Sequence, residues 1–308
     1  MLRASQPIET VLDDPATPAA VRQRLILVLE VREFARELGL TVEDQYTRYA
    51  PWPGDHVVTT VVTTRPGEVH PAGFWFPIVG RVPYKGYFEA ARAANEAERL
   101  RGRGFDVCLV KVPAYSTLGW FDDPVTDPML RQSEGSLVET LLHELTHATI
   151  FVRNRAAFNE GIASFVGEEA RVRFYAEARG TPAADAERRQ VTENRRVQAE
   201  LLRVRDEVES LYASRQPDAA RDAQRADIET RGRAHIARLE LASRDASDLA
   251  SGIRLNDACL ALVGTYASEI DQFAAVLASL GGDLPAFLER ARHAAGASHP
   301  ERALLGAE

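Results

Sequence analysis

The stretch from residue 183 to 249 limits the possible folds of this chain more than any other feature. It is dense in Arg, Glu, Ala and Gln, with one break at Gln216-Pro217. These residues favour helix, whereas a proline removes a backbone donor and interrupts it. The stretch therefore predicts two long helices folded back on each other as a hairpin. Because helical spacing continues after it, residues 181–308 are expected to form a helical lobe.

The earlier part of the chain, residues 1–180, combines patterns typical of strands with patterns typical of helices. β-Branched and aromatic runs predict strands at Val57–Thr64, Phe74–Val79 and Val107–Val112. Apolar residues at helical spacing predict helices over 18–38, 87–100, 255–280 and 286–295. The expected fold class is α+β, with a small mixed or antiparallel sheet in the first half and one continuous unit overall.

Charge and hydropathy exclude two classes of interaction. The formal net charge is -8, and the basic residues between 188 and 238 alternate with acids, which is typical of a solvated helix face. Phosphate contacts need clustered Lys and Arg, so we expect no nucleic-acid partner. No run of about 18 apolar residues occurs, so we expect no transmembrane segment. The 183–249 hairpin is expected to be either an arm that binds a partner protein or a lid.

The N-terminal sequence and the cysteines bear on the compartment. Residues 1–14, MLRASQPIETVLDD, lack the apolar core of a secretory signal, so the sequence as it stands predicts a cytoplasmic protein. Cys108 and Cys259 lie far apart in apolar surroundings and are expected to be buried thiols rather than a disulfide. Since no Cys-x-x-Cys pair occurs, a metal ion would have to be bound by histidine and carboxylate side chains.

The stretch HELTH, residues 143–147, has the spacing of a metal-binding helix. Residues four apart lie one above the other on a helix, so His143 and His147 can present ring nitrogens to one cation. Glu144 then points to the adjacent open position, where it can take a proton from a metal-bound water. An accidental HExxH would need no third ligand, whereas a catalytic metal site does.

The next helical segment supplies candidates for that third ligand. Glu160 follows Asn159, which is expected to cap a helix that runs to Gly180. Glu168 and Glu169 compete for the role, but they lie two turns further along. We therefore expect Glu160 to be the third ligand.

The two helices that would hold the ion also show specific end and packing signals. Ser136 and Glu139 form a capping box that predicts the start of the first helix. Gly161 and Gly167 leave room for the two helices to approach each other closely. Two His and one Glu with an open fourth position favour zinc. Non-haem iron in oxygenases uses the same residue types, but usually on the strands of a barrel.

At this point the sequence resembles a known family. HELTH followed by FNEGIASF resembles the gluzincin metallopeptidases, in which a Glu on a second helix completes the zinc site. More narrowly, PIVGRVPYKGYF (77–88), VPAYSTLGWFDDP (112–124) and LNDACLALVGTY (255–266) resemble the bacterial family of predicted aminopeptidases. The resemblance extends from about Pro7 to Arg292 and is weakest over 183–249.

The resemblance implies a zinc peptidase in which His143, His147 and Glu160 bind the ion and Glu144 is the general base. It also implies that the AYSTLG segment, residues 114–119, is an edge strand along which a peptide substrate lies.

The chain departs from the family pattern in three respects. Relatives often begin with a lipoprotein-type signal, which is not present in this sequence, so a periplasmic or membrane-anchored location is the alternative to the cytoplasm. Many relatives also have two cysteines where this chain has Trp75 and Arg81. The name aminopeptidase is itself largely inferred from the zinc motif.

Four further residues are candidates for contacts with substrate. Tyr115 and Tyr266 could stabilise the developing oxyanion, although either can equally be structural. Asp122 and Asp123 could bind the free amine of a substrate, although Asp-Asp-Pro is also a common turn.

The sequence therefore predicts a zinc-dependent peptidase that hydrolyses peptide bonds with Glu144 as general base, acting from the amino end of its peptide substrate. One alternative is an endopeptidase or amidase with the same zinc centre. Another is a non-catalytic binding module that zinc stabilises while the helical hairpin recruits a partner. The presence of Glu144 argues against the module, because a structural zinc site has no use for a base.

Overall fold

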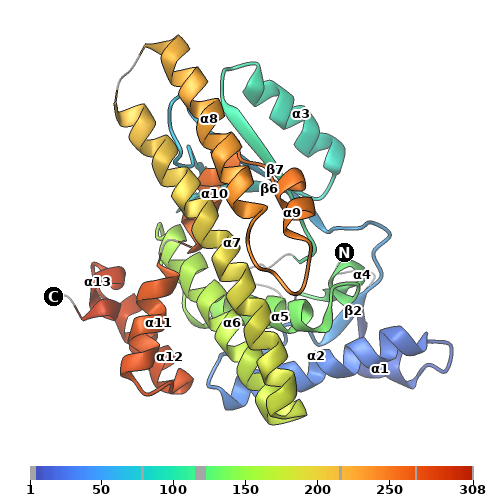
Figure 1. Ribbon diagram of the computed structural model, residues 1–308. Coiled ribbons are helices and arrows are strands. Elements are labelled where there is room, and N and C mark those ends of the chain that lie inside the picture. The colour runs from blue at the N-terminus through green and yellow to red at the C-terminus, as the bar shows by residue number, and fades with distance from the viewer. Residues whose placement is uncertain (1–4, 78–79, 115–122, 215–216, 268, 307–308) are drawn as a thin grey trace. The chain divides into compact units, whose positions relative to one another are not determined.

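The computed structural model describes residues 5–77, 80–114, 123–214, 217–267 and 269–306 (Figure 1). The fold is mixed α+β, as the sequence predicts. The chain divides into two compact units, each built from separate stretches of sequence. Unit 1 comprises 1–59, 111–187 and 269–308, and unit 2 comprises 60–110 and 188–268. The predicted halves, 1–180 and 181–308, are each one continuous stretch of sequence, unlike these units. They stay a prediction.

Unit 1 is mainly helical. Its helices are α1 (Ile8–Asp13), α2 (Ala19–Glu37), α4 (Asp127–Leu130), α5 (Glu134–Thr149), α6 (Ala156–Arg179), α11 (Ile270–Ser279), α12 (Leu284–Ala295) and α13 (Pro300–Leu305). A small sheet has the order β1 (Gln6–Pro7), β2 (Arg48–Ala50) and β8 (Val125–Thr126). Strand β2 pairs antiparallel with β1 and parallel with β8.

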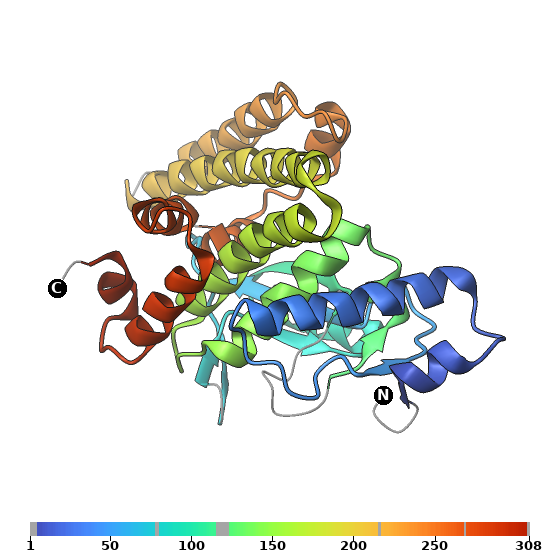
Figure 2. The same cartoon turned by 90° about the horizontal axis from the view of Figure 1, so that it is seen from below.

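The core of unit 1 surrounds α5 and α6, which lie side by side in both views (Figures 1 and 2). Five apolar α5 residues are completely buried: Leu137, Val138, Leu141, Leu142 and Leu145. These leucines recur at helical spacing, so they hold one face of α5 in the core. The opposite side of α5 faces α6 and contains the two histidines of HELTH.

An aromatic cluster packs α6 against the C-terminal helices. The Phe165 ring of α6 lies 5.9 Å from Phe273 of α11 and 5.0 Å from Phe287 of α12, between centroids. All three rings are buried. Residues from the end of the chain are therefore part of the core that supports α6.

Unit 2 contains the predicted strands and most of the helical hairpin. Its strands are β3 (Val58–Thr64), which begins in unit 1, β4 (Phe74–Phe76), β5 (Gly80–Val82), β6 (Tyr84–Tyr87) and β7 (Asp106–Val112). They form a three-stranded sheet of order β6-β3-β7 and the hairpin β4-β5. Its helices are α3 (Ala90–Arg101), α8 (Asp218–Ile236), α9 (Ala246–Gly252), α10 (Asp257–Ala267) and most of α7 (Thr181–Ala213).

The two long helices predicted for 183–249 are confirmed as α7 and α8, although α8 ends at Ile236, well before residue 249. Their contact is apolar: Val204 and Val208 of α7 are buried in one cluster with Ile228 of α8. A side chain at Gly232 of α8 would clash with Val204, so the glycine permits this close approach. No helix in the described part of the chain is long and apolar enough to span a membrane.

The expectation that Cys108 and Cys259 are unpaired thiols is wrong. They form a disulfide between β7 and α10, with their Cα atoms 5.1 Å apart. The Asp106 carboxylate brings the two elements together, because it accepts hydrogen bonds from the Asn256 side chain and the Ala258 backbone. A pairing across 151 residues leaves no local pattern in the sequence. Disulfides persist in oxidising compartments, and the cytoplasmic location stays a prediction.

The hairpin β4-β5 explains one departure from the family pattern. Trp75 and Arg81 are directly paired across it, and paired Cα atoms lie about 4.5–5.5 Å apart. That separation suits a disulfide, so cysteines at these two positions in relatives would be within bonding reach. In this chain the Trp75 side chain is instead 66% exposed.

Candidate metal centre

Helix α5 begins earlier than the capping box predicts. Its N-cap is Ser133, whose Oγ accepts a hydrogen bond from the Ser136 backbone at 3.1 Å. The prediction of a Ser136–Glu139 box is therefore wrong, because Glu139 pairs with Arg171 of α6 at 2.7 Å instead. The first part of α5 is thus held by a cap at Ser133 and by the ion pair of Glu139 with the buried Arg171 of the neighbouring helix.

Helix α6 likewise begins earlier than expected, at Ala156. Asn159, the predicted N-cap, lies inside the first turn and fastens the preceding loop. Its side chain accepts from the Val152 N–H at 2.8 Å and donates to the Val152 carbonyl at 2.9 Å. These two hydrogen bonds hold the α5–α6 connection against the first turn of α6. Glu160 is the next residue of that helix.

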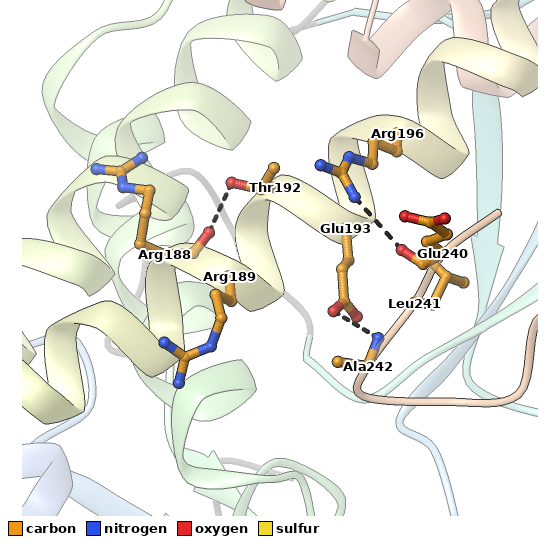
Figure 3. A pocket seen from close by; sticks show the side chains of 8 residues that line it. All are labelled: Arg188, Arg189, Thr192, Glu193, Arg196, Glu240, Leu241 and Ala242. Atoms are coloured by element: carbon orange, nitrogen blue, oxygen red, sulfur yellow. Dashed lines mark hydrogen bonds between the residues drawn. The ribbon is translucent and has the colours of Figure 1, made fainter.

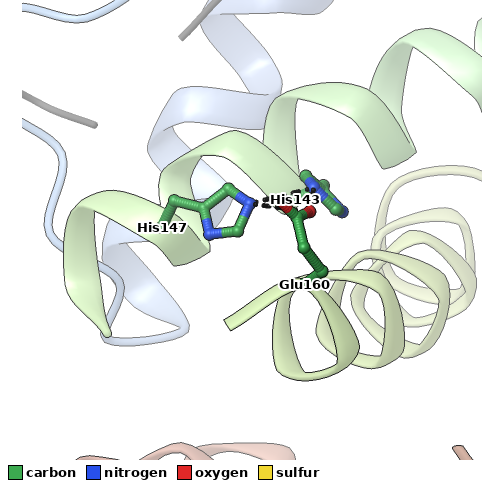
Figure 4. A group of neighbouring side chains, drawn as sticks. All are labelled: His143, His147 and Glu160. Atoms are coloured by element: carbon green, nitrogen blue, oxygen red, sulfur yellow. Dashed lines mark hydrogen bonds and ion pairs between the residues drawn. The ribbon is translucent and has the colours of Figure 1, made fainter. Parts of the chain in front are cut away.

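Three predicted ligands meet between α5 and α6 (Figure 4). The Nε2 atoms of His143 and His147 lie 3.1 Å apart. The Glu160 Oε2 atom lies 3.5 Å from Nε2 of His143 and 3.4 Å from Nε2 of His147. Among the described residues, no other set of His, Cys, Asp and Glu converges in this way.

The three distances fit a zinc ion. Zinc binds imidazole nitrogen and carboxylate oxygen at about 2.0–2.1 Å in tetrahedral geometry, which places the ligand atoms ~3.3 Å from each other. The observed separations of 3.1, 3.4 and 3.5 Å lie on either side of that value. Two imidazoles and one carboxylate leave one tetrahedral position for another group.

The charges around the candidate centre favour the ionised form of Glu160, the form in which a carboxylate binds a metal ion. Burial opposes charge on Glu160, but the charges of His147 and His143 and hydrogen bonds from both hold the pKa of Glu160 well below its usual range. Burial likewise disfavours charge on His143, but a hydrogen bond from it to Glu160 and the charge of Glu144 leave the His143 pKa raised. The negative charges of Glu144 and Glu160 therefore stabilise a positive charge at the centre, whether a proton or a metal ion supplies it.

Close helix packing at the centre depends on Gly167. A Cβ there would lie 3.1 Å from the Glu139 carbonyl oxygen and 3.4 Å from the His143 Cβ, so the predicted role of Gly167 is confirmed. Gly161 faces α11 instead, where a Cβ would lie 3.2 Å from the Phe273 ring. The absence of a side chain at Gly167 lets α6 approach α5 next to His143.

A family comparison agrees with the motif. The family model described as "Putative aminopeptidase" matches residues 1–305. The chain belongs to this family. The range matched by the aminopeptidase family includes both units and all of the residues of the candidate centre. No curated protein and no solved structure matches this aminopeptidase-family chain.

Other predicted site residues of this aminopeptidase-family chain have different outcomes. Tyr115 and Asp122 lie outside the described residues, as does most of the predicted edge strand. Tyr266 lies on α10 in unit 2, and its role stays a prediction. Glu168 is buried and Glu169 is partly buried, but neither is part of the convergent set.

Asp123 is buried and lies next to a residue that sequence reasoning missed. Its backbone carbonyl accepts a hydrogen bond from the Tyr46 N–H at 2.8 Å. The negative charges of Glu144 and Asp123 both act on the Tyr46 phenol. Nothing in the sequence around Tyr46 distinguishes it from a core tyrosine, because its neighbours come from segments far along the chain.

A concavity with a volume of about 500 Å³ lies in unit 2, between α7 and residues 240–242 (Figure 3). The Arg188 and Arg189 side chains point away from the Glu240 segment (Figure 3). The Glu193 carboxylate accepts the Ala242 N–H at 2.8 Å. The polar side chains that line the concavity therefore stabilise the fold of unit 2 and do not point toward a common ligand position. Partner binding by the hairpin stays a prediction.

Proposed function

We propose that this aminopeptidase-family protein is a zinc-dependent peptidase of gluzincin type. The observation that supports it is the meeting of His143, His147 and Glu160 at tetrahedral spacing, with Glu144 next to a ligand on the same helix. A buried structural zinc would need a fourth protein ligand, and the convergent set has three members among the residues that the structure describes.

The chain's own residues have defined tasks in the reaction. His143, His147 and Glu160 would hold the zinc ion, which polarises the scissile carbonyl and lowers the pKa of a bound water to about 7. Glu144 is half-buried at the side of this centre. It accepts the proton of the attacking water and passes it to the departing amine. Peptide hydrolysis consumes one water, so Glu144 returns to its starting state after each turnover.

The position of cleavage is a separate part of the proposal. An aminopeptidase must bind the free α-amine of its substrate, and a carboxylate near the general base is suited to this task. We assign this task to Asp123, a candidate carboxylate that is buried in unit 1, the unit that contains Glu144. Endopeptidase or amidase activity at the same centre predicts cuts that do not depend on a free amine.

The test compares wild-type protein with Glu144→Gln, both loaded with zinc and incubated with a mixed peptide library. We expect one zinc per chain in both proteins, and a loss of cleavage of at least about 100-fold in the variant. Cuts confined to the first bond, and abolished by N-acetylation of the peptides, support an aminopeptidase. Internal cuts support an endopeptidase. Zinc binding without any cleavage by wild type would refute the peptidase and leave the binding module.

A further inference from the structure

Arg171 of α6 is a charged residue in the core of unit 1. Its side chain is only 5% exposed, and an unpaired charge in such a place is strongly destabilising. Two carboxylates neutralise it. Its Nη1 atom lies 2.7 Å from Oε2 of Glu139 on α5, and its Nε atom donates to Oε2 of Glu187 on α7 at 2.5 Å. One guanidinium therefore joins α5, α6 and the first part of α7 within unit 1.

The first turn of α5 leaves room for this guanidinium. A Cβ on Gly135 would lie 2.9 Å from Nε and 3.0 Å from Cζ of Arg171, and 2.5 Å from Oε2 of Glu187. These separations are shorter than van der Waals contact, so the position requires glycine. Arg171 thus lies against α5 at two places one turn apart, the Gly135 backbone and the Glu139 carboxylate.

The contacts of Arg171 belong to a series that extends to the candidate metal centre. Residues at every fourth position lie along one face of a helix, and on α5 this face contains Gly135, Glu139, His143 and His147. On α6, Arg171 lies against the first two of these, Gly167 against the middle two, and Glu160 against the two histidines. The two helices therefore match each other in one register.

A change of register would move Glu160 away from the imidazoles. A helix rises about 1.5 Å per residue, so sliding α6 along α5 by one residue would move the carboxylate by about that distance. Metal–ligand distances tolerate only about 0.2 Å. A planar guanidinium that bonds to carboxylates on two sides adds geometric specificity that apolar packing lacks. The ion pairs of Arg171 are therefore suited to fix the register.

We infer that Arg171 is a positioning residue, which fixes the register of α6 on α5 so that Glu160 reaches a metal ion held by His143 and His147. The inference rests on the zinc centre of the proposed function. Arg171 acts through its contacts with α5, not on the ion itself.

Charge alone predicts the opposite effect of removing Arg171. The residue is a cation, so its replacement by methionine reduces the repulsion of a zinc ion and should strengthen zinc binding. Loss of the register should weaken zinc binding, because the third ligand is displaced. The sign of the change in zinc affinity therefore separates a positioning role from an electrostatic one.

The experiment measures the zinc affinity of full-length Arg171→Met by competition with a chelator, with Arg173→Met as the matched control. Arg173 lies on the same helix and pairs with Glu177 of that helix at 2.8 Å. We expect Arg171→Met to bind zinc about 10–100-fold more weakly, as loss of ligand supports does, and Arg173→Met to stay within about threefold of wild type. In cobalt-substituted protein the visible spectrum, which reports ligand geometry, should change only in Arg171→Met.

Folding of each variant is checked by its melting transition. Folded Arg171→Met that binds zinc as tightly as wild type or more tightly overturns the positioning role, as do equal losses in Arg171→Met and Arg173→Met. If Arg171→Met does not fold, Arg171→Lys decides, because it keeps the charge but replaces the planar fork by one ammonium group. It should bind zinc at least about threefold more weakly, and wild-type affinity in this variant overturns the role.

The failure of this inference and that of the proposed function are distinguishable. Wild-type protein that binds zinc but cleaves no peptide overturns the peptidase and leaves the positioning role of Arg171 to the affinity measurements. Wild-type protein that binds no zinc overturns both.

Discussion

Glu269, at the N-terminal end of α11, is a carboxylate in an unfavourable place. Its Oε2 atom is buried without a hydrogen-bond partner, and it lies 3.9 Å from the position of a Cβ on Gly161. Burial raises the pKa of Glu269, and the charge of Glu301 raises it further. The folded protein therefore disfavours the charged form of this side chain relative to the unfolded chain.

This shift predicts a pH-dependent effect of Glu269→Gln. Below the unfolded pKa of about 4.3 Glu269 is neutral in both states and costs nothing. As pH rises through the folded pKa, the charged form is disfavoured only in the folded state, and the wild type loses stability. At pH 7.5 we expect the variant to melt about 2–4 °C higher, equivalent to roughly 1 kcal/mol, and at pH 4 to melt with the wild type.

The control for Glu269→Gln is Asp271→Asn, at an exposed position of α11. Its effect on the melting temperature should be small at both pH values. A Glu269→Gln variant that is less stable than wild type at pH 7.5 would contradict the interpretation, because it would mean that the carboxylate has a favourable partner in the folded protein.

At the scale of single residues, the sequence was sufficient to predict that His143, His147 and Glu160 converge, and insufficient to predict the contacts that support them. His143, His147 and Glu160 could be predicted because helical spacing alone brings two of them together and chemistry demands a third. The hydrogen bond from the Tyr46 N–H to the Asp123 carbonyl could not be predicted, since it joins segments far apart in the sequence. A pattern within a short stretch of sequence predicts only the geometry of that stretch, not its contacts with distant residues.

The packing of α5 on α6 determines how far Glu160 lies from the two imidazoles. At Gly167 an added methyl group would meet a backbone carbonyl and the Cβ of a ligand, neither of which can rotate away. At Gly161 it would meet the edge of the Phe273 ring, which can shift. These two glycines lie in the same helix, so they form a matched pair.

We predict that Gly167→Ala weakens zinc binding by about 10–100-fold, the range typical of changes that displace ligand supports. Gly161→Ala should have an effect of less than about threefold, although both gain the intrinsic helix preference of Ala. Competition with a chelator measures the affinity in each case. Equal affinities for the two variants would show that the α5–α6 distance is not what sets the geometry of the centre.

Long periodic elements could be predicted and short ones could not. Strand β3 and helix α3 lie close to their predicted ranges, and the long α7–α8 pair was predicted although α8 ends before residue 249, because each of these elements has a repeating pattern. Strands β1 and β8 have two residues each and exist only because β2 lies beside them. The capping box at Ser136 failed because Glu139 has a better partner in Arg171, an ion pair that no local pattern shows.

Over the whole molecule, the Cys108–Cys259 disulfide and the candidate metal centre belong to different units. The disulfide joins two elements of unit 2, whereas His143, His147 and Glu160 all lie in unit 1. A bond that closes a loop of this length stabilises the folded state mainly by restricting the unfolded chain.

We therefore predict that replacing both Cys108 and Cys259 by Ser lowers the free energy of unfolding by about 2–4 kcal/mol. The number of zinc ions bound per folded chain should stay the same. Calorimetry and metal analysis on the same samples measure the two quantities, and mild reduction of the wild type is the matched comparison. Loss of zinc from the folded double variant would contradict the independence of the two units.

The interleaving of the two units has a consequence for synthesis. Helices α5 and α6 are translated before Phe273 and Phe287, which pack against Phe165 of α6. During synthesis, α5 and α6 are therefore both present while Phe165 of α6 still lacks the two rings that pack against it. The aromatic cluster that supports one side of α6 can therefore form only after α11 and α12 have been translated.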